Sequence, residues 1–409
     1  MKRLKKIKIL LITILVLINP IFVNALNYPE LDSKIIEIYD LTDKKLIYDI
    51  DKDKVTSIAS LTKIATTITA IENIINLEEE VTITNSILST VRWDASKAGL
   101  KAGDKLTYRD LLYASMLPSG ADATNSIAIL STGSIDNFVD KMNELAKKIG
   151  LKNTHFVNVT GLDAEGHYST ANEIRILLEY ALENELFRKI YTTREYTLSN
   201  GLEVSSTIVT YNKSGLVDTN KIIGSKTGYT GEAGYCLSSI SDINSHEFII
   251  IVLNAEHKDN KYYNIVDTVN LINFLLENYK DQTLVNKNEL VKTIPIKLSK
   301  TNKYEIRTQQ EVKKYLPSDY DKSKLKVEYN GLEELSFMNK EGQNIGTITY
   351  YYDGNLLTKD NIVLETKIEI SIKKVLKEYY YIFILIPIII IIIIIIFFKR
   401  KKKKRKRKK

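Results

Sequence analysis

Cysteine is almost missing from this sequence, since Cys236 is the only cysteine in 409 residues. The chain can therefore form no internal disulfide, whatever the redox state of its compartment. We expect Cys236 to be a small buried strand residue and not a catalytic thiol.

Histidine is also scarce. No two of the four histidines are spaced four residues apart as metal ligands on a helix would be, and there is no HExxH motif. They are His155, His167, His246 and His257. The sequence therefore predicts no metal site and no cofactor.

The middle of the chain has no excess of basic residues, although the whole chain carries a formal charge of +8. Five basic residues lie in the first eight positions, and eleven occupy residues 399–409. Without these two groups, 42 basic residues face 50 acidic ones, a net charge of −8. The basic ends therefore give no reason to expect a nucleic-acid partner.

Two segments have the composition of membrane-targeting sequences. Residues 1–25 change from basic to apolar to small, which is typical of a secretory signal peptide. Residues 379–398 are apolar apart from tyrosines at one end, and a helix of this length spans the bilayer core of about 30 Å. The basic tail 399–409 would stay cytoplasmic, which predicts a single-pass protein of the cell membrane with its middle part outside.

The middle of the chain divides into two modules near residue 281. Residues 26–281 mix helical and strand patterns and predict an α+β domain, whereas residues 282–376 predict a small all-β domain. We expect helices at 60–75, 108–117, 121–131, 135–149, 171–187 and 263–280. Strands are expected at 34–39, 45–50, 222–229, 234–240, 247–254, 291–298, 325–329, 345–352 and 362–370.

The pattern Ser-x-x-Lys offers a serine nucleophile with a base one helical turn away. A serine hydroxyl needs such a base at neutral pH, and a lysine can serve only if burial or positive charge lowers its pKa. The pattern occurs at Ser60–Lys63, Ser323–Lys326 and Ser371–Lys374. Only Ser60 lies where a hairpin leads into a predicted helix, whose N-terminal N–H groups are also available.

Two short motifs follow. The SGA motif at 119–121 lies between predicted helices, and by itself it would be an ordinary turn. The KTG motif at 226–228 precedes a predicted strand, and by itself it would be an exposed edge with a solvated lysine. On a strand edge, however, a lysine and a hydroxyl can bind a carboxylate, and glycine lets a substrate backbone come close.

In the order SxxK, SGA and KTG, the motifs resemble those of the penicillin-recognising serine transferases, and more narrowly the low-molecular-weight D-alanyl-D-alanine carboxypeptidases of peptidase family S11. Other stretches that resemble this family are 56–63, 99–104, 153–158, 224–230 and 232–237. The resemblance covers residues 30–280. It implies a transpeptidase-like fold with an antiparallel sheet flanked by helices, and a serine-type carboxypeptidase acting on peptidoglycan pentapeptides and inhibited by β-lactams.

The resemblance also implies a role for each motif residue. Ser60 would be the acyl-ester nucleophile, Lys63 the general base and Ser119 a proton shuttle. The substrate would be bound by Lys226, Thr227, Gly228 and Tyr229. Backbone N–H groups of Ser60 and Tyr229 would form the oxyanion hole.

Ala121 departs from the family pattern, which commonly has asparagine at this position. The missing amide leaves open a catalytically weak wall-binding protein on the same fold. A class A β-lactamase is another alternative, but it requires a deacylating glutamate, for which Glu165 is the nearest candidate. A transpeptidase would differ only in using an amine in place of water. The all-β module carries no chemical motif, and we expect it to act as a stalk.

Overall fold

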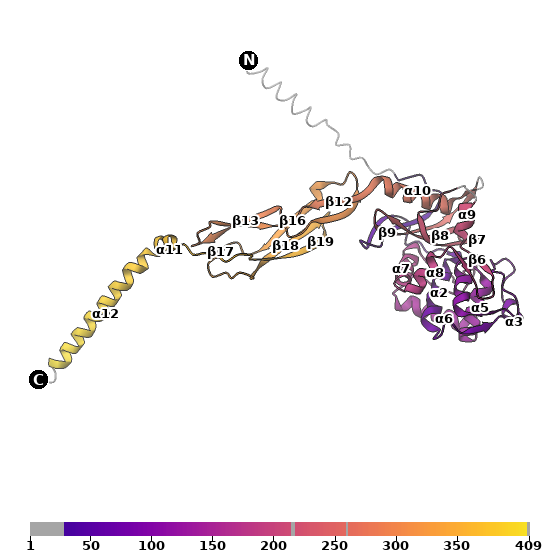
Figure 1. Ribbon diagram of the computed structural model, residues 1–409, viewed down its shortest axis with the longest axis horizontal. Coiled ribbons are helices and arrows are strands. Elements are labelled where there is room, and N and C mark those ends of the chain that lie inside the picture. Colours follow the sequence, from indigo (N-terminus) through magenta and orange to yellow (C-terminus); the bar gives the residue numbers. More distant parts are fainter. Residues whose placement is uncertain (1–27, 214–216, 259–260, 407–409) are drawn as a thin grey trace, which may run out of the picture. The chain divides into compact units, whose positions relative to one another are not determined.

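The computed structural model describes residues 28–213, 217–258 and 261–406 (Figure 1). The predicted signal peptide, residues 1–25, lies outside these ranges. The chain divides into two compact units, Met1–Lys280 and Asp281–Lys409.

The first unit is built on a five-stranded antiparallel sheet with the order β2-β1-β9-β8-β7. The predicted hairpin and three later strands are present. Every side chain from Phe248 to Leu253 on β9 is buried, because this central strand is covered on both faces. The strands are β1 (Ile35–Asp40), β2 (Lys45–Ile50), β7 (Ile222–Thr230), β8 (Gly234–Ile243) and β9 (His246–Ala255).

Helices cover both faces of this sheet. Figure 1 shows α10 on one side, with α2, α7 and α8 on the other. The helices are α2 (Thr62–Asn73), α3 (Asn85–Leu88), α4 (Tyr108–Met116), α5 (Ala121–Thr132), α6 (Ile135–Lys148), α7 (Ala171–Leu182), α8 (Glu185–Thr192), α9 (Thr207–Lys213) and α10 (Tyr263–Asn278). Short two-stranded ribbons are β3 (Glu80–Thr82) with β4 (Lys105–Thr107), β5 (Glu195–Thr197) with β6 (Glu203–Ser205), and β10 (His257–Lys258) with β11 (Lys261–Tyr262).

The single helix expected over 171–187 was wrong, because the structure has two helices there. Asn184 ends the first and caps the second, since its Oδ1 accepts from the N–H groups of Leu186 and Phe187 at 3.0 Å. An asparagine that satisfies two free N–H groups in this way favours a new helix start over a continuous helix.

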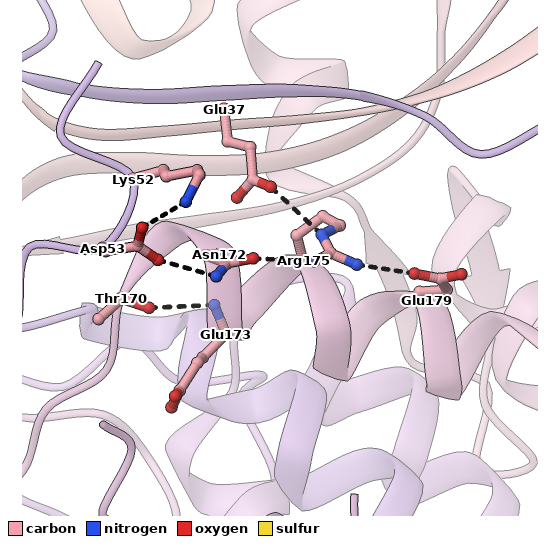
Figure 2. Close-up of polar contacts among 8 residues, drawn as sticks. All are labelled: Glu37, Lys52, Asp53, Thr170, Asn172, Glu173, Arg175 and Glu179. Atoms are coloured by element: carbon pink, nitrogen blue, oxygen red, sulfur yellow. Dashed lines mark hydrogen bonds and ion pairs between the residues drawn. The ribbon is translucent and has the colours of Figure 1, made fainter. Parts of the chain in front are cut away.

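A polar network joins α7 to β1 and to the segment after β2 (Figure 2). The guanidinium of Arg175 donates to Glu37 at 3.2 Å, to Glu179 at 2.8 Å and to Asn172 at 2.8 Å. Asn172 in turn donates to Asp53 at 2.8 Å. Glu37 is 1% exposed, and this burial raises its pKa to about 7 even though Arg175 acts to lower it. The network therefore fixes the N-terminal part of α7 against β1 and the segment after β2.

The second unit is rich in strands, as expected after residue 281. Its core contains Ile294, Ile306, Ile348 and Tyr350. The strands are β12 (Tyr279–Val285), β13 (Leu290–Lys297), β14 (Lys303–Arg307), β15 (Val312–Pro317), β16 (Leu325–Gly331), β17 (Leu335–Ser336), β18 (Asn344–Tyr352) and β19 (Asn355–Val363).

The strand expected over 362–370 was placed too late. A turn at Asp353 and Gly354 pairs β19 with β18, so the strand runs over Asn355–Val363. Ile362, Leu364 and Ile368 are buried in the core, and their alternation with polar residues explains the error.

Two helices end the described chain. They are α11 (Ile372–Glu378) and α12 (Tyr380–Lys406). Among the described residues, α12 alone is long and apolar enough to cross a membrane, over Tyr380–Lys401. This helix contains the predicted membrane segment, 379–398, except for its first residue.

Candidate active site

Ser60 and Lys63 lie at the start of α2, where a short 3₁₀ turn (Ala59–Leu61) leads into the helix. Lys63 Nζ donates to Ser60 Oγ at 3.0 Å and to the carbonyl of Thr160 at 2.6 Å. Lys63 is 2% exposed, and burial lowers its pKa to about 7 although the charge of Asp122 acts in the opposite direction. With its pKa lowered in this way, the Lys63 amine is partly uncharged near neutral pH and able to accept a proton.

The loop that supplies the Thr160 carbonyl is held by Asn158. Its Oδ1 accepts from the N–H groups of Thr160 at 3.1 Å and Gly161 at 2.7 Å, and its Nδ2 donates to Leu162 O at 2.8 Å. Gly161 has φ +85°, and a Cβ there would lie 1.9 Å from the carbonyl oxygen of Ala59. Only glycine permits this approach, so the loop packs directly against the residue before Ser60.

His167 supports the turn at Ala59 through Thr62. Its Nδ1 accepts from Val157 N at 3.2 Å, so its Nε2 carries the proton and donates to Thr62 Oγ1 at 2.8 Å. Thr62 Oγ1 donates to Ala59 O at 2.9 Å. Burial lowers the pKa of His167 to about 4, so the ring is neutral at neutral pH. Ala59, with φ 47°, is thereby held in a backbone conformation that is rare for alanine.

Ser119 occupies the loop between α4 and α5, as expected, with φ 63°. It is 5% exposed, and its Oγ makes no hydrogen bond with any described residue. The backbone at Gly120 packs closely against α4, because a Cβ on Gly120 would lie 2.6 Å from Ala114 O. No described hydrogen bond joins Ser119 to Ser60 or Lys63, so its hydroxyl is buried with its bonding capacity unused.

Asp122, directly after the SGA motif, organises a neighbouring loop. Its carboxylate accepts from the N–H groups of Ala98, Gly99 and Leu100 at 2.8 to 3.0 Å. These residues overlap the stretch 99–104 that resembles the family. Asp122 therefore fixes the loop that lies against the N-terminus of α5.

The KTG motif lies on β7, the edge strand of the sheet. Lys226 is 1% exposed and donates to Thr227 O at 2.8 Å. Burial lowers the pKa of Lys226 well below its usual value, and the nearby Lys63 lowers it further. Thr227 Oγ1 lies 2.5 Å from Thr207 Oγ1 on α9.

Gly228 brings β7 against the turn that contains Ser60. A Cβ at this position would lie 2.9 Å from Ser60 N and 3.0 Å from Ala59 Cβ. Tyr229, which follows, is 59% exposed and stacks on Tyr235 with ring centroids 4.3 Å apart. The SxxK and KTG motifs therefore meet, although 163 residues separate Lys63 from Lys226.

A cavity of about 260 Å³ lies beside Ala121. Its lining includes Thr160, Asn158, Arg92 and Asn125, the residue one helical turn after Ala121. Asn125 Nδ2 donates to Thr90 Oγ1 at 2.9 Å. The cavity therefore borders the position at which this sequence departs from the SxN pattern that it otherwise resembles.

Several supporting residues were not found from the sequence. Thr160 contributes a backbone carbonyl, so its side-chain type gives no signal. Asn158 lies in the stretch 153–158 that resembles the family, but nothing in its spacing indicates the loop that it holds. His167 and Thr207 reach the site through the tertiary fold alone.

Three further expectations concern residues away from the motifs. Cys236 is fully buried on β8, which confirms its interpretation, and burial raises the pKa of its thiol to about 12. Glu165 is exposed and makes no described contact with Ser60, which argues against a deacylating role. Among the described residues, Asp40, Asp43 and His246 place potential ligand atoms within 4.8 Å, but His246 Nδ1 already bonds Asp40 at 2.9 Å.

Comparison with known proteins agrees with this geometry. Residues 23–257 match the family described as D-alanyl-D-alanine carboxypeptidase, and residues 279–370 match the C-terminal domain of penicillin-binding protein 5. The D-alanyl-D-alanine carboxypeptidase DacF of Bacillus subtilis (strain 168) is 29% identical over 329 residues, which cover 78% of this chain and 81% of that protein.

Two solved structures are also similar. Penicillin binding protein 5 from Haemophilus influenzae has a TM-score of 0.60 at 23% identity, covers 84% of this chain and is itself fully covered, which establishes the fold. The Streptomyces K15 DD-transpeptidase has a TM-score of 0.53 at 27% identity, over 61% of this chain and 98% of its own. Since the family match spans more than half of the sequence, the chain belongs to the D-alanyl-D-alanine carboxypeptidase family.

Proposed function

We propose that this chain removes the terminal D-alanine from peptidoglycan stem peptides through an acyl-enzyme on Ser60. The observation that carries the proposal is the 3.0 Å contact between Lys63 Nζ and Ser60 Oγ, made by a lysine with its pKa lowered to about 7. A buried amine of this kind can take the serine proton at neutral pH, which an ordinary lysine cannot do.

In the proposed acylation, Ser60 Oγ attacks the carbonyl carbon between the two D-alanines while its proton passes to Lys63. The peptide C–N bond then breaks, and the proton held by Lys63 passes through the Ser119 hydroxyl to the leaving amine. Water afterwards attacks the ester, gives Ser60 back its proton and releases the shortened peptide.

Two features support substrate binding at β7. The substrate carboxylate is proposed to bind Lys226 and Thr227, and its negative charge would favour the protonated form of Lys226, which burial disfavours in the empty site. The N–H groups of Ser60 and Tyr229 are proposed to hold the oxyanion, where one such donor contributes about 3 kcal/mol to the transition state. The close fit of Gly228 against Ser60 N supports this arrangement.

Water is the proposed acceptor of the acyl group. The likeness to a structure named as a DD-transpeptidase keeps an amine acceptor as the second candidate. Incubating the protein with a D-Ala-D-Ala peptide and glycine distinguishes the two, because a transpeptidase would release a glycine-ended peptide in addition to the hydrolysed one.

The membrane arrangement is part of the proposal. We infer that α12 anchors the chain in the cell membrane, with the catalytic unit outside and the basic C-terminus in the cytoplasm. The β-rich second unit would act as a stalk. Deleting residues 282–375 while keeping α12 should then spare activity on a soluble peptide and reduce activity on intact wall.

Mass spectrometry after treatment with benzylpenicillin tests the catalytic proposal directly. We expect one covalent adduct on the peptide that contains Ser60, and none in Ser60→Ala. The matched control is Ser323→Ala, which removes the serine of another SxxK pattern and should label fully. Folded protein without an adduct on Ser60 would refute the acyl-enzyme.

A further inference from the structure

An exposed apolar turn lies beside the helix that leads to the membrane segment. Phe337 is 44% exposed and Met338 is 73% exposed, which is unusual for large apolar side chains next to each other. The turn is held firmly, since Ser336 N donates to Asn339 Oδ1 at 2.8 Å and Met338 N donates to Ser336 Oγ at 3.3 Å. Its two apolar side chains are therefore presented outward by a fixed backbone.

The register of β13 places this turn and the start of α11 at the same end of the second unit (Figure 1). Lys297 pairs with Ser336 of β17 in the parallel ladder. The next residue, Leu298, accepts a hydrogen bond from Ser371 N at 2.7 Å. The start of the turn and the start of α11 are therefore bonded to neighbouring residues, Lys297 and Leu298, at the end of β13.

The exposed face of α11 is also apolar. Ile372 is 70% exposed and Leu376 is 48% exposed, and their spacing of four residues puts them on one side of the helix. Lys374, on the other side, donates to Ser299 O and to Asn302 Oδ1, each at 2.6 Å. The helix is therefore attached to the unit by its polar side, with its apolar side turned away.

We define the apolar tip as Phe337, Met338, Ile372 and Leu376. Exposed lysines accompany it, and α12 starts at Tyr380, two residues after α11 ends. These lysines are Lys340, Lys373 and Lys377. Exposed Glu341 and Glu378 lie beside Lys340 and Lys377 in the sequence, so the match to a bilayer rests mainly on the apolar groups, which enter the interface, while the three ammonium groups can meet the phosphates.

We propose that the apolar tip inserts into the outer interface of the same membrane that α12 crosses. It rests on the anchoring role proposed for α12, since a membrane-spanning α12 places the tip within a few residues of the lipid surface. Two separate attachments, a helix across the bilayer and a turn in its interface, would restrict the tilt of the stalk more than a single helix does.

Site-specific labelling tests this with the full chain in vesicles of phosphatidylcholine and phosphatidylglycerol. Cys236 is fully buried, so a new surface cysteine takes the fluorophore selectively. The probe site is Met338→Cys. The control is Leu356→Cys, which is 54% exposed and lies by the β18–β19 turn, away from Ser336. A third site, Ile392→Cys, reports on α12.

Lipids carrying a spin label near the headgroup should quench the fluorophore at 338 at least about twofold more than at 356. Lipids labelled deep in the acyl chain should quench the fluorophore at 392. Equal quenching at 338 and 356, with 392 quenched, would overturn the tip proposal and leave the anchor intact. Absence of deep quenching at 392 would instead overturn the proposed anchor, and the tip proposal with it.

The double variant Phe337→Ser, Met338→Ser, labelled at Lys340→Cys, provides a second measurement. Shallow quenching at 340 should fall to the level of the control at 356, because the turn no longer has apolar groups to hold it in the interface. Unchanged quenching at 340 would show that these side chains do not cause the contact, and would also overturn the proposal.

Discussion

Ser60–Lys63 in the first unit and Ser323–Lys326 in the second have the same spacing but opposite surroundings. Lys63 is buried against Thr160 and has a lowered pKa. Lys326 is exposed and pairs with Glu328 at 2.6 Å, and this partner raises its pKa. Ser323 Oγ is bonded to Asp321 and not to a lysine amine. Burial, and not spacing, therefore decides whether such a pair can react.

The third copy of the pattern, Ser371–Lys374, is used structurally. Ser371 caps α11 by accepting from Lys374 N at 3.4 Å, and Lys374 fastens the helix to the β-rich unit. The same two residue types therefore serve as a helix cap and a clamp when no buried pocket is present.

Lys63→Arg should cause the largest loss of activity among the variants considered. The guanidinium stays protonated at all accessible pH values and cannot act as a base, so kcat/KM should fall by about 10³-fold. Release of D-alanine from a soluble D-Ala-D-Ala peptide measures the loss. Lys326→Arg is the matched control and should keep full activity, and a Lys63→Arg protein with near-normal turnover would contradict the role of Lys63 as base.

Gly228→Ala should show how closely β7 must approach the nucleophile. The added methyl group would lie 2.9 Å from Ser60 N and push either β7 or the turn that contains Ser60 out of position. The rate of penicillin acylation should therefore drop about 10²-fold. Gly231→Ala is a control nearby in the sequence, because a Cβ there meets nothing within 4 Å. Similar rates for the two variants would mean that the contact between Gly228 and Ser60 is not needed.

Arg175→Met should show that a buried ion pair in the first unit contributes more to stability than an exposed pair in the second unit. It removes the guanidinium from the buried Glu37 and leaves the charge of Lys52 to act on that carboxyl, so the unfolding free energy should fall by up to about 3 kcal/mol at pH values well above 7, where Glu37 is ionised. Below pH 7 the cost should shrink, because Glu37 becomes protonated and neutral. In the second unit Arg307→Met removes an exposed pair with Glu305 and should cost less than about 0.5 kcal/mol. Denaturation curves at two pH values check both expectations.

The pH dependence of acylation should show whether Lys63 has a lowered pKa, unlike the exposed Lys326. Since the proposed base is the neutral form of Lys63, the rate should rise about tenfold per pH unit as pH increases toward about 7, and then level off. Stopped-flow acylation by a chromogenic β-lactam measures this limb. A rate that keeps rising to pH 10 would instead indicate a lysine as exposed as Lys326.

Ala121→Asn should have the smallest effect. The cavity beside Ala121 has room for the amide, and one added hydrogen bond to the substrate contributes about 1 kcal/mol, so kcat/KM should increase about fivefold. Steady-state kinetics on the same peptide check this, with thermal unfolding as a control for folding. A decrease in a stably folded variant would mean that the open space itself serves the substrate.

Much of the architecture could be predicted from local patterns. Periodicity and length predict the β1–β2 hairpin, the helix after Ser60, strands β7, β8 and β9, and the apolar C-terminal helix. The errors came where a local pattern was ambiguous. Asn184 interrupts an otherwise helical stretch, and the alternation over 362–370 buries side chains without forming a strand.

For this protein, the sequence alone determined which residue types are available and in what order, including the serine and lysine one turn apart, because spacing along a helix is a local property. The burial of Lys63, its contact with the Thr160 carbonyl and the approach of Gly228 to Ser60 all depend on the tertiary fold. Desolvation depends on residues distant along the chain, and so the reactivity proposed for Ser60 is a property of the folded unit.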